Sequence, residues 1–304
     1  MRPLKLGIIG MSSGNGHPYS WSAIFNGYKS DAMENCGFPA IPRYLEKQQF
    51  PKDSISDANV THVWTQDIAI SNHLAAAANI ANVVKDPADM IGQVDGILLA
   101  RDDAETHYEF AAPFLEAGLP IYIDKPICLS EKELDDLYAL QKFPGQIFTC
   151  SAVSYGREFQ LTDAIRTKVG ELQYIYASTP KDWEKYGIHV IEPLLKISGD
   201  QGKLRRYQRW TQGNNYSVNY YWDSGFQATI AALGDLKCPI SLRLVGDNGW
   251  HEMVLIDSFY AFKAALLDFV RGIVNRDVRT DPDFVRQVVR IIECGKSDQT
   301  LNGD

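Results

Sequence analysis

The alternation of short apolar strands with helical segments in the first part of the chain is the feature that most constrains the fold. Leu4–Gly10, Val94–Ala100 and Leu119–Asp124 are nearly unbroken apolar runs, which is typical of strands covered on both faces. Asp67–Ala81 and Ala104–Gly118, which lie between such runs, have the apolar spacing of helices. The alternation predicts a doubly wound parallel sheet of the Rossmann type, in which ligands bind at the carboxyl ends of the strands.

An irregular insertion interrupts this alternation. Asp31–Asp57 is rich in proline, and only the part around Arg43–Gln48 has the pattern of a short helix. Two further strands follow it, a β-branched one over Ala58–Thr65 and a short one over Asn82–Val84. No function follows from the sequence of the insertion.

The pattern changes after Pro126. A helix over Ser130–Lys142, a strand over Gln146–Val153 and a helix near Arg157–Val169 precede longer, aromatic, alternating runs with glycine turns between them. These runs are Leu172–Ser178, Leu204–Thr211, Ser217–Trp222, Phe226–Ala232, Ile240–Gly246 and His251–Leu255. Their spacing predicts a largely antiparallel sheet.

Two helices, over Ser258–Asn275 and Asp281–Cys294, end this half of the chain, and the polar tail from Ser297 is expected to fray. The predicted architecture is therefore α/β. A dinucleotide-binding domain over residues 1–126 precedes an α+β substrate-binding domain over residues 127–304.

The composition argues against several classes of function. A net charge of −8 and a pI of about 5.3 disfavour a general affinity for nucleic acid or for an anionic membrane, because both attract basic surfaces. The five cysteines are scattered, without a CxxC pair or a histidine at metal-ligand spacing, so we expect reduced thiols and no metal site. The first apolar run stops at Gly10, too early for a signal peptide or a membrane span, which favours a cytoplasmic protein.

The turn after the first strand is the first candidate site. Gly10-Met11-Ser12-Ser13-Gly14 follows a strand and precedes a helix, so its backbone N–H groups could cradle the pyrophosphate of a dinucleotide. The turn departs from the GxGxxG pattern, because serine replaces the second glycine and residues 17–20 lengthen it. An ordinary glycine-rich turn is the alternative interpretation.

Charged residues after two other strands belong at the same edge of the sheet. Asp67 is a candidate for contact with the adenosine ribose, and it equally suits the start of the following helix. NAD is favoured slightly over NADP, because no arginine stands beside Asp67. Arg101 and Asp102, with His107 in the next turn, are further candidates for cofactor contacts. A surface salt bridge between Arg101 and Asp102 or Asp103 is the alternative.

The strongest short signal is Asp124-Lys125-Pro126, at the end of the last strand of the nucleotide-binding half. A lysine fixed between a carboxylate and a ring-locked residue is well placed to hydrogen-bond a substrate hydroxyl and the nicotinamide ribose. Such precise placement is what hydride transfer needs. We therefore expect Lys125 at the centre of the active site and Asp124 beside the cofactor.

A second cluster of candidates lies in Trp183–Glu192. Tyr186, His189 and Glu192 recur at helical intervals and could share one face of a helix. A histidine can accept the proton of a hydroxyl as hydride departs, since its ordinary pKa lies near working pH, and a satisfied core or capping residue is the alternative. Aromatic faces suit the apolar face of a sugar ring, and the chain is 11% aromatic. The predicted substrate contacts are Tyr155, Trp183, Tyr186 and His189.

The order of elements and these residues together resemble the glucose–fructose oxidoreductase/inositol dehydrogenase/MocA (Gfo/Idh/MocA) family, over nearly the whole chain. In that family a glycine turn binds NAD(P), an EKP tripeptide supplies a catalytic lysine, and a helix with a DxGxH-like pattern supplies further catalytic residues. Asp124-Lys125-Pro126 stands where EKP is expected, and Val94–Pro126, with His107, is similar to the corresponding family segment. Gly187-Ile188-His189 matches the end of the second pattern.

The resemblance implies an NAD(P)-dependent enzyme of carbohydrate metabolism that oxidises or reduces a secondary alcohol or carbonyl of a sugar, cyclitol or nucleotide sugar. Lys125 and His189 would be catalytic. Lys185 occupies the place of the family aspartate, and Tyr186 is a substitute proton donor. The resemblance also implies a homodimer or homotetramer that associates through the open sheet of the C-terminal domain.

Two alternatives to a dehydrogenase stay open at this level. The altered glycine turn and Lys185 are compatible with a non-catalytic dinucleotide-binding sensor. A retained NAD could also oxidise and re-reduce one substrate, which would give net non-redox sugar chemistry.

Overall fold

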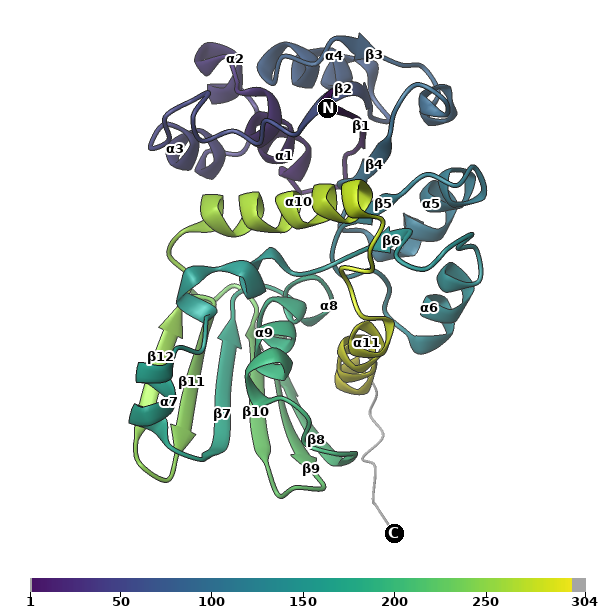
Figure 1. Cartoon of the computed structure of the whole chain (residues 1–304). Coiled ribbons are helices and arrows are strands. Elements are labelled where there is room, and N and C mark those ends of the chain that lie inside the picture. The colour runs from purple at the N-terminus through teal and green to yellow at the C-terminus, as the bar shows by residue number, and fades with distance from the viewer. Residues whose placement is uncertain (1, 297–304) are drawn as a thin grey trace. The chain divides into compact units, whose positions relative to one another are not determined.

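The computed structural model describes residues 2–296, which form two compact units (Figure 1). Within the described residues, the first unit consists of residues 2–128, 132–150 and 262–282, and the second of residues 129–131, 151–261 and 283–296. The division differs from the expected boundary after residue 126, because two later segments return to the first unit. The expected fraying from Ser297 lies outside the described residues.

The first unit is built on a six-stranded sheet with the order β3-β2-β1-β4-β5-β6. Its strands are β1 (Leu4–Ile9), β2 (Ala58–Trp64), β3 (Asn82–Val83), β4 (Gly96–Leu99), β5 (Ile121–Ile123) and β6 (Ile147–Phe148). All neighbouring pairs are parallel, which confirms the predicted Rossmann-type sheet. The strand order reverses between β1 and β4, and ligands of such sheets bind at this switch point.

Helices join these strands and complete the first unit. They are α1 (His17–Asn26), α2 (Ser30–Glu34), α3 (Ala40–Leu45), η1 (Pro87–Met90), α4 (Ile68–Ala77), η2 (Ala104–Thr106), α5 (His107–Glu116), α6 (Glu131–Tyr138) and α10 (Ser258–Asn275). From residue 262 onward α10 belongs to this unit. The Phe269 ring of α10 lies 5.7 Å from the rings of both Tyr122 and Phe148, so a distant helix completes the core around β5 and β6.

The proline-rich insertion supports the turn that precedes α1. A Cβ atom on Gly16 would lie 2.6 Å from Cδ1 of Ile41 and 2.7 Å from Cγ of Phe38. A side chain at this position would force Ile41 and Phe38 to move. The insertion therefore packs directly against the start of α1, which gives a structural role to a segment whose sequence suggested none.

The second unit contains a six-stranded sheet with the order β12-β11-β7-β10-β9-β8. Its strands are β7 (Leu172–Thr179), β8 (Leu204–Gln212), β9 (Asn215–Trp222), β10 (Gln227–Leu233), β11 (Ser241–Gly246) and β12 (Trp250–Val254). Only β10 and β7 pair in parallel in this sheet, which confirms a largely antiparallel arrangement. Its helices are η3 (Ala152–Tyr155), η4 (Arg157–Phe159), α7 (Asp163–Val169), α8 (Trp183–Tyr186), α9 (Ile188–Ser198) and α11 (Pro282–Lys296).

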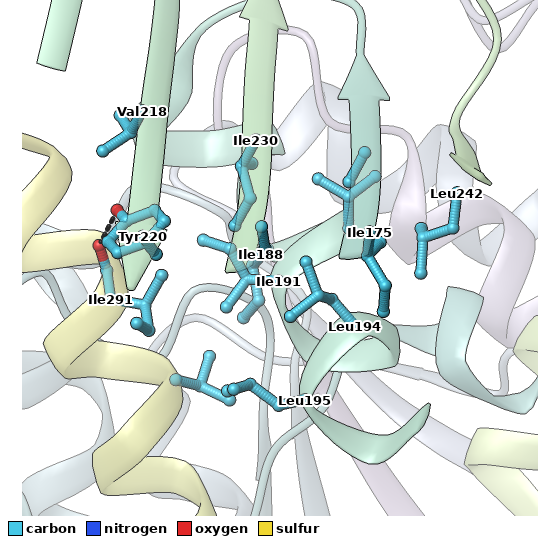
Figure 2. Close-up of a cluster of buried hydrophobic side chains, with 14 of the residues drawn as sticks. Ile175, Ile188, Ile191, Leu194, Leu195, Val218, Tyr220, Ile230, Leu242 and Ile291 are labelled. Carbon is cyan, nitrogen blue, oxygen red and sulfur yellow. Dashed lines mark hydrogen bonds between the residues drawn. The ribbon is translucent and has the colours of Figure 1, made fainter. Parts of the chain in front are cut away.

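Helix α9 is held against this sheet by an apolar face (Figure 2). Ile188, Ile191 and Leu194 are buried in the same cluster as strand residues of β7, β9, β10 and β11. Full burial of each such side chain is worth about 1.5–3 kcal/mol. Tyr220 also donates its hydroxyl to the carbonyl of Ile291 at 2.9 Å, which ties β9 to α11. The helix that carries His189 therefore has a fixed position within its unit.

The helix expected over Trp183–Glu192 is divided in two. Helix α8 ends at Tyr186, and α9 begins at Ile188. The N–H of Gly187 donates to the carbonyl of Trp183, and a Cβ atom at this glycine would lie 2.6 Å from that oxygen. Gly187 itself has helical dihedral angles, with φ −53° and ψ −38°, and a side chain there would lie too close to the Trp183 carbonyl.

Candidate active site

The carboxyl edge of the parallel sheet brings together residues that are far apart in the sequence. The hydroxyl of Ser12, after β1, donates to Oδ1 of Asp102, after β4, at 2.6 Å. The second carboxylate oxygen of Asp102 lies 3.5 Å from Nζ of Lys125, after β5. All three side chains are buried. The predicted serine, aspartate and lysine therefore lie in one network at the switch point of the sheet.

Asp124 holds a second part of this edge. Its Oδ1 accepts the backbone N–H of Lys125 at 2.8 Å, and its Oδ2 accepts the side-chain amide of Asn15 at 2.9 Å. Nδ1 of His17 lies 2.5 Å from the same Oδ2. A buried carboxylate with three donors is a fixed anion, so Asp124 locks both the glycine turn and the backbone of Lys125 in place.

The glycine turn offers fewer donors than the sequence suggested. The N–H of Gly10 donates to the carbonyl of Trp64 at 3.0 Å, and the N–H of Met11 donates to the side-chain oxygen of Gln66 at 2.8 Å. The prediction that these two N–H groups cradle a phosphate is therefore wrong, because β2 and the residue after it already use them. Ser13 and Gly14 are exposed, and Gly14 has a φ of 78°, which favours glycine.

The start of α1 is also closed to a ligand. The N–H of His17 donates to Oδ1 of Asn15 at 2.8 Å, Pro18 has no N–H, and those of Tyr19 and Ser20 donate to the carbonyl of Gly16. Helix N-termini bind phosphate through backbone donors that are unsatisfied within the helix. The strand order of this edge and its exposed turn at residues 13–14 fit a dinucleotide. A phosphate would therefore be held by the loop and not by the start of α1.

Arg101 is occupied within the protein. Its guanidinium pairs with the carboxylate of Asp103, donates to the carbonyl of Met11 at 3.2 Å and lies 4.8 Å from the centre of the Phe110 ring. Arg101 is 8% exposed. The salt bridge with Asp103, which was the alternative interpretation, is present, but it is buried and not on the surface. The predicted contact of Arg101 with the cofactor is therefore replaced by a structural role, in which Arg101 fixes the glycine turn.

His107 is likewise a structural residue. Its side chain is fully buried, and its two ring nitrogens each lie 2.9 Å from a backbone carbonyl, those of Ile127 and Arg101. The imidazole joins the segments that follow β4 and β5. The prediction of a cofactor contact is wrong for His107, because no ring nitrogen is left for a ligand.

Asp67 begins helix α4. One of its carboxylate oxygens accepts the N–H of Ala69 at 2.8 Å, which is an N-cap contact. The side chain is exposed, and the cap occupies one oxygen. Asp67 therefore caps the following helix, as the alternative interpretation predicted, and its contact with a ribose stays a prediction.

In the second unit, His189 lies between Tyr186 and a serine that the sequence did not single out. Nδ1 of His189 is 2.9 Å from Oγ of Ser151, and the rings of His189 and Tyr186 meet edge to face at 5.0 Å. The hydroxyl of Tyr186 accepts a hydrogen bond from Nζ of Lys181, whose cation also lies 4.2 Å from the tyrosine ring.

Glu192 fixes the backbone on which Ser151 sits. The buried carboxylate of Glu192 accepts the N–H of Ser151, the hydroxyl of Ser154 at 2.7 Å and Nζ of Lys196 at 2.9 Å. The helical spacing suggested that Glu192 shares one helix face with His189. Its carboxylate instead contacts the residues just listed. Its contacts make it a positioning residue for the serine that orients the imidazole.

Two of the predicted substrate contacts have different surroundings. Trp183 is 1% exposed in the core of its unit, and its Nε1 donates to the carbonyl of Ile292 at 2.9 Å. It is not available to a sugar, so that prediction is wrong. The ring of Tyr155 is partly exposed, with Nζ of Lys196 at 5.0 Å from its centre, and a substrate contact of Tyr155 stays a prediction.

The aspartate nearest to Lys185 is the N-cap of α8. The backbone N–H of Lys185 donates to Oδ1 of Asp182 at 2.7 Å, so the aspartate of this segment stands three residues earlier and caps α8. His17, Asn15, Ser151 and Gln66 are among the residues of these networks that the sequence did not single out as candidates. A histidine directly after a glycine turn was the available signal for His17.

Comparison with known proteins gives a family match and several solved structures of similar fold. Residues 38–151 match the model of a family described as an oxidoreductase family with an NAD-binding Rossmann fold. The chain resembles myo-inositol 2-dehydrogenase of Lactobacillus plantarum with a TM-score of 0.76 at 14% identity, over 97% of this chain and 96% of that one. It resembles scyllo-inositol dehydrogenase of Lactobacillus casei, bound to NAD(H) and scyllo-inositol, with a TM-score of 0.70 at 13% identity, over 96% and 95%.

A nucleotide-sugar enzyme has a similar fold. UDP-N-acetylglucosamine 3-dehydrogenase of Acidithiobacillus ferrooxidans matches with a TM-score of 0.68 at 15% identity, over 97% of each chain. A protein of Amycolatopsis mediterranei named as a UDP-kanosamine synthase oxidoreductase subunit is 28% identical over 137 residues, 44% of this chain. That match spans 35% of the relative, about a third of its length. None of the helices within residues 2–296 is long and apolar enough to cross a membrane.

Proposed function

We propose that the chain, whose residues 38–151 match the model of an oxidoreductase family with an NAD-binding Rossmann fold, transfers a hydride between a nicotinamide dinucleotide and a carbon that bears a hydroxyl group. The observation that carries the proposal is the position of Lys125. Its side chain is buried at the end of β5, close to the switch point, with Nζ 3.5 Å from the carboxylate of Asp102. A cation held there can orient a substrate oxygen without moving during the reaction.

The residues divide into those that hold the cofactor and those that treat the substrate. The exposed turn of Ser13 and Gly14 would hold the pyrophosphate through its backbone N–H groups. Bound nicotinamide supplies the hydride acceptor or donor. Lys125 orients the reacting oxygen, and His189 takes or returns its proton, with its ring orientation set by Ser151. Tyr186, beside the Lys181 cation, is the second candidate for this proton.

We assign NAD in preference to NADP on the charge after β2. Asp67 is an exposed carboxylate at that position, and it would repel the 2′-phosphate of NADP while it could accept a hydrogen bond from a free 2′-hydroxyl. Fluorescence titration with NADH and NADPH measures the preference. Asp67→Ala should narrow the difference between the two dissociation constants, and equal affinities in the wild type would overturn the assignment.

The proposed substrate is a sugar, a cyclitol or a nucleotide sugar. Support comes from the partly exposed ring of Tyr155 and from the hydroxyl groups and cations gathered near His189, which are partners for a polyhydroxylated molecule. A panel of inositols, hexoses and UDP-sugars, followed by the absorbance of reduced nicotinamide, identifies the substrate.

We also propose that the chain forms a homodimer or homotetramer through the sheet of the second unit. Tyr176, Trp210 and Trp250 on β7, β8 and β12 are 38%, 57% and 55% exposed, and large exposed aromatic side chains favour association. Light scattering after size exclusion tests the oligomer, and a monomer would overturn it. The five free cysteines fit the reducing cytoplasm, which is the proposed location.

Replacement of Lys125 tests the central claim. Lys125→Met should lower turnover by roughly 10²-fold or more while NADH still binds, because the loss falls on the chemical step. Lys132→Met is the matched control, since Lys132 is an exposed lysine of α6 that pairs with Asp136. Equal turnover in the two variants would overturn the role of Lys125.

A further inference from the structure

A histidine in the nucleotide-binding unit has the surroundings of an oriented acid–base group. His17 is the first residue of α1, and its Nδ1 lies 2.5 Å from Oδ2 of Asp124. The carboxylate is 1% exposed, and the imidazole is 18% exposed. A buried carboxylate that fixes a partly exposed imidazole is the arrangement in which a histidine is oriented for proton transfer.

The tautomer of His17 follows from its neighbours. Asp124 also accepts the N–H groups of Lys125 and the Asn15 side chain, and as a carboxylate it has no proton to donate. The proton between the pair therefore belongs to Nδ1. Nε2 makes no hydrogen bond with any residue in the described part of the chain. It is the ring atom that remains to exchange a proton with a ligand.

Aromatic contacts hold the ring of His17 in one orientation. Trp21, one turn further along α1, stacks on it at 5.2 Å with an angle of 12° between the planes. Phe262 of α10 meets it edge to face at 5.0 Å. Two ring contacts and a carboxylate leave little rotational freedom. A residue that only caps the start of a helix needs neither these ring contacts nor the carboxylate.

We propose that His17 is a second proton-transfer residue of this oxidoreductase, which acts through Nε2 at the same edge of the sheet as Lys125. This inference rests on the proposed function. In the oxidation direction, the one proton of the substrate O–H group would bind Nε2 of His17 in place of His189, and bound oxidised nicotinamide would accept the hydride as the C=O bond forms. Asp124 stabilises the imidazolium that results and keeps its own charge.

His17→Asn separates this role from a structural one. The asparagine amide nitrogen can replace Nδ1 as the donor to Asp124, so the network is kept and only Nε2 is lost. We expect kcat to fall by about 10²-fold, with KM and the dissociation constant of NADH changed by less than about threefold. His62→Asn is the matched control, because His62 is a half-buried histidine of β2. A His17→Asn enzyme with the kcat of the control would overturn the inference.

A second readout does not depend on turnover. Nitrogen NMR of the protein without ligands should show the neutral His17 ring protonated on Nδ1, and a proton on Nε2 would overturn the inference. The two failures are distinct. A wild type that neither binds NADH nor oxidises any polyol or nucleotide sugar overturns the proposed function and this inference with it, whereas an active wild type with an equally active His17→Asn variant overturns only the inference.

Discussion

The carboxylate of Asp124 is the group on which the carboxyl edge of the first unit most depends, and Asp124→Asn measures that dependence. The substitution keeps the shape of the side chain and replaces one acceptor oxygen with an NH2 donor. With the new nitrogen turned toward Lys125, the backbone N–H at 2.8 Å loses its acceptor. Turned the other way, it meets the amide of Asn15 and the ring of His17. At least one donor then faces another donor.

The expected cost follows from the three hydrogen bonds. A buried N–H without an acceptor costs about 1–3 kcal/mol. The two remaining bonds change from charge-assisted to neutral, which costs on the order of 1 kcal/mol each. Asp124→Asn should therefore destabilise the first unit by about 3–5 kcal/mol. At 1.36 kcal/mol for each factor of ten, the opening of its sheet becomes roughly 10² to 10⁴ times more frequent.

Hydrogen exchange followed by mass spectrometry measures this opening locally. Peptides that contain β4 and β5 should exchange faster in Asp124→Asn, while those of β9 and β10 in the second unit serve as a reference within the same molecule. Asp86→Asn is the control substitution, because Asp86 is an exposed cap of η1 and asparagine caps equally well. Exchange of β5 at the control rate would refute the assignment of Asp124 as a fixed anion.

Three further outcomes are expected. Gly295→Ala should cost about 1–3 kcal/mol, because the new methyl group would overlap the buried ring of Trp183, and an unchanged thermal midpoint would contradict this. Burial raises the pKa of Cys294 to about 11, so its alkylation near neutral pH should be on the order of 10²-fold slower than that of a free cysteine, as followed by peptide mass spectrometry. Burial and then the nearby Cys36 raise the pKa of Tyr19 from 10.0 to about 12. The contribution of Tyr19 to stability is complete below pH 10.0 and is lost toward about pH 12, so Tyr19→Phe should flatten the alkaline decline in urea unfolding, and an identical slope would contradict this.

The sheets were predictable because their strands differ in periodicity. All residues of β4 and β5 are buried, as expected for strands covered on both faces, whereas β9 alternates between buried and partly exposed positions. The sequence did not predict that α10 packs in the first unit. Its apolar spacing requires a partner surface but does not specify which one, and its aromatic residues complete the core of the distant first unit.

A residue of the candidate site was predictable where its position at the end of a strand fixes its location. It was not predictable where its role depends on which residue it contacts in the folded protein. Lys125 follows β5, and any residue there lies at the carboxyl edge. Arg101, His107 and Trp183 are residue types that suit either a ligand or the interior. In the structure, Arg101 pairs with Asp103, His107 contacts two backbone carbonyls, and Trp183 donates to the carbonyl of Ile292. Such contacts depend on tertiary structure.

His17 and His189 are two candidate proton-transfer residues, and their hydrogen-bond partners impose different constraints on them. His17 contacts the carboxylate of Asp124, which accepts in this pair, so Nδ1 is the ring atom that donates. His189 contacts the hydroxyl of Ser151, which can donate or accept, so a proton can reside on either side of that bond. His17 is thus restricted to exchange at Nε2, whereas His189 can change tautomer while Ser151 turns its hydroxyl. Replacement of Ser151 by alanine would remove the orientation of His189 and leave that of His17 intact, so the pH dependence of turnover in Ser151→Ala separates the two groups.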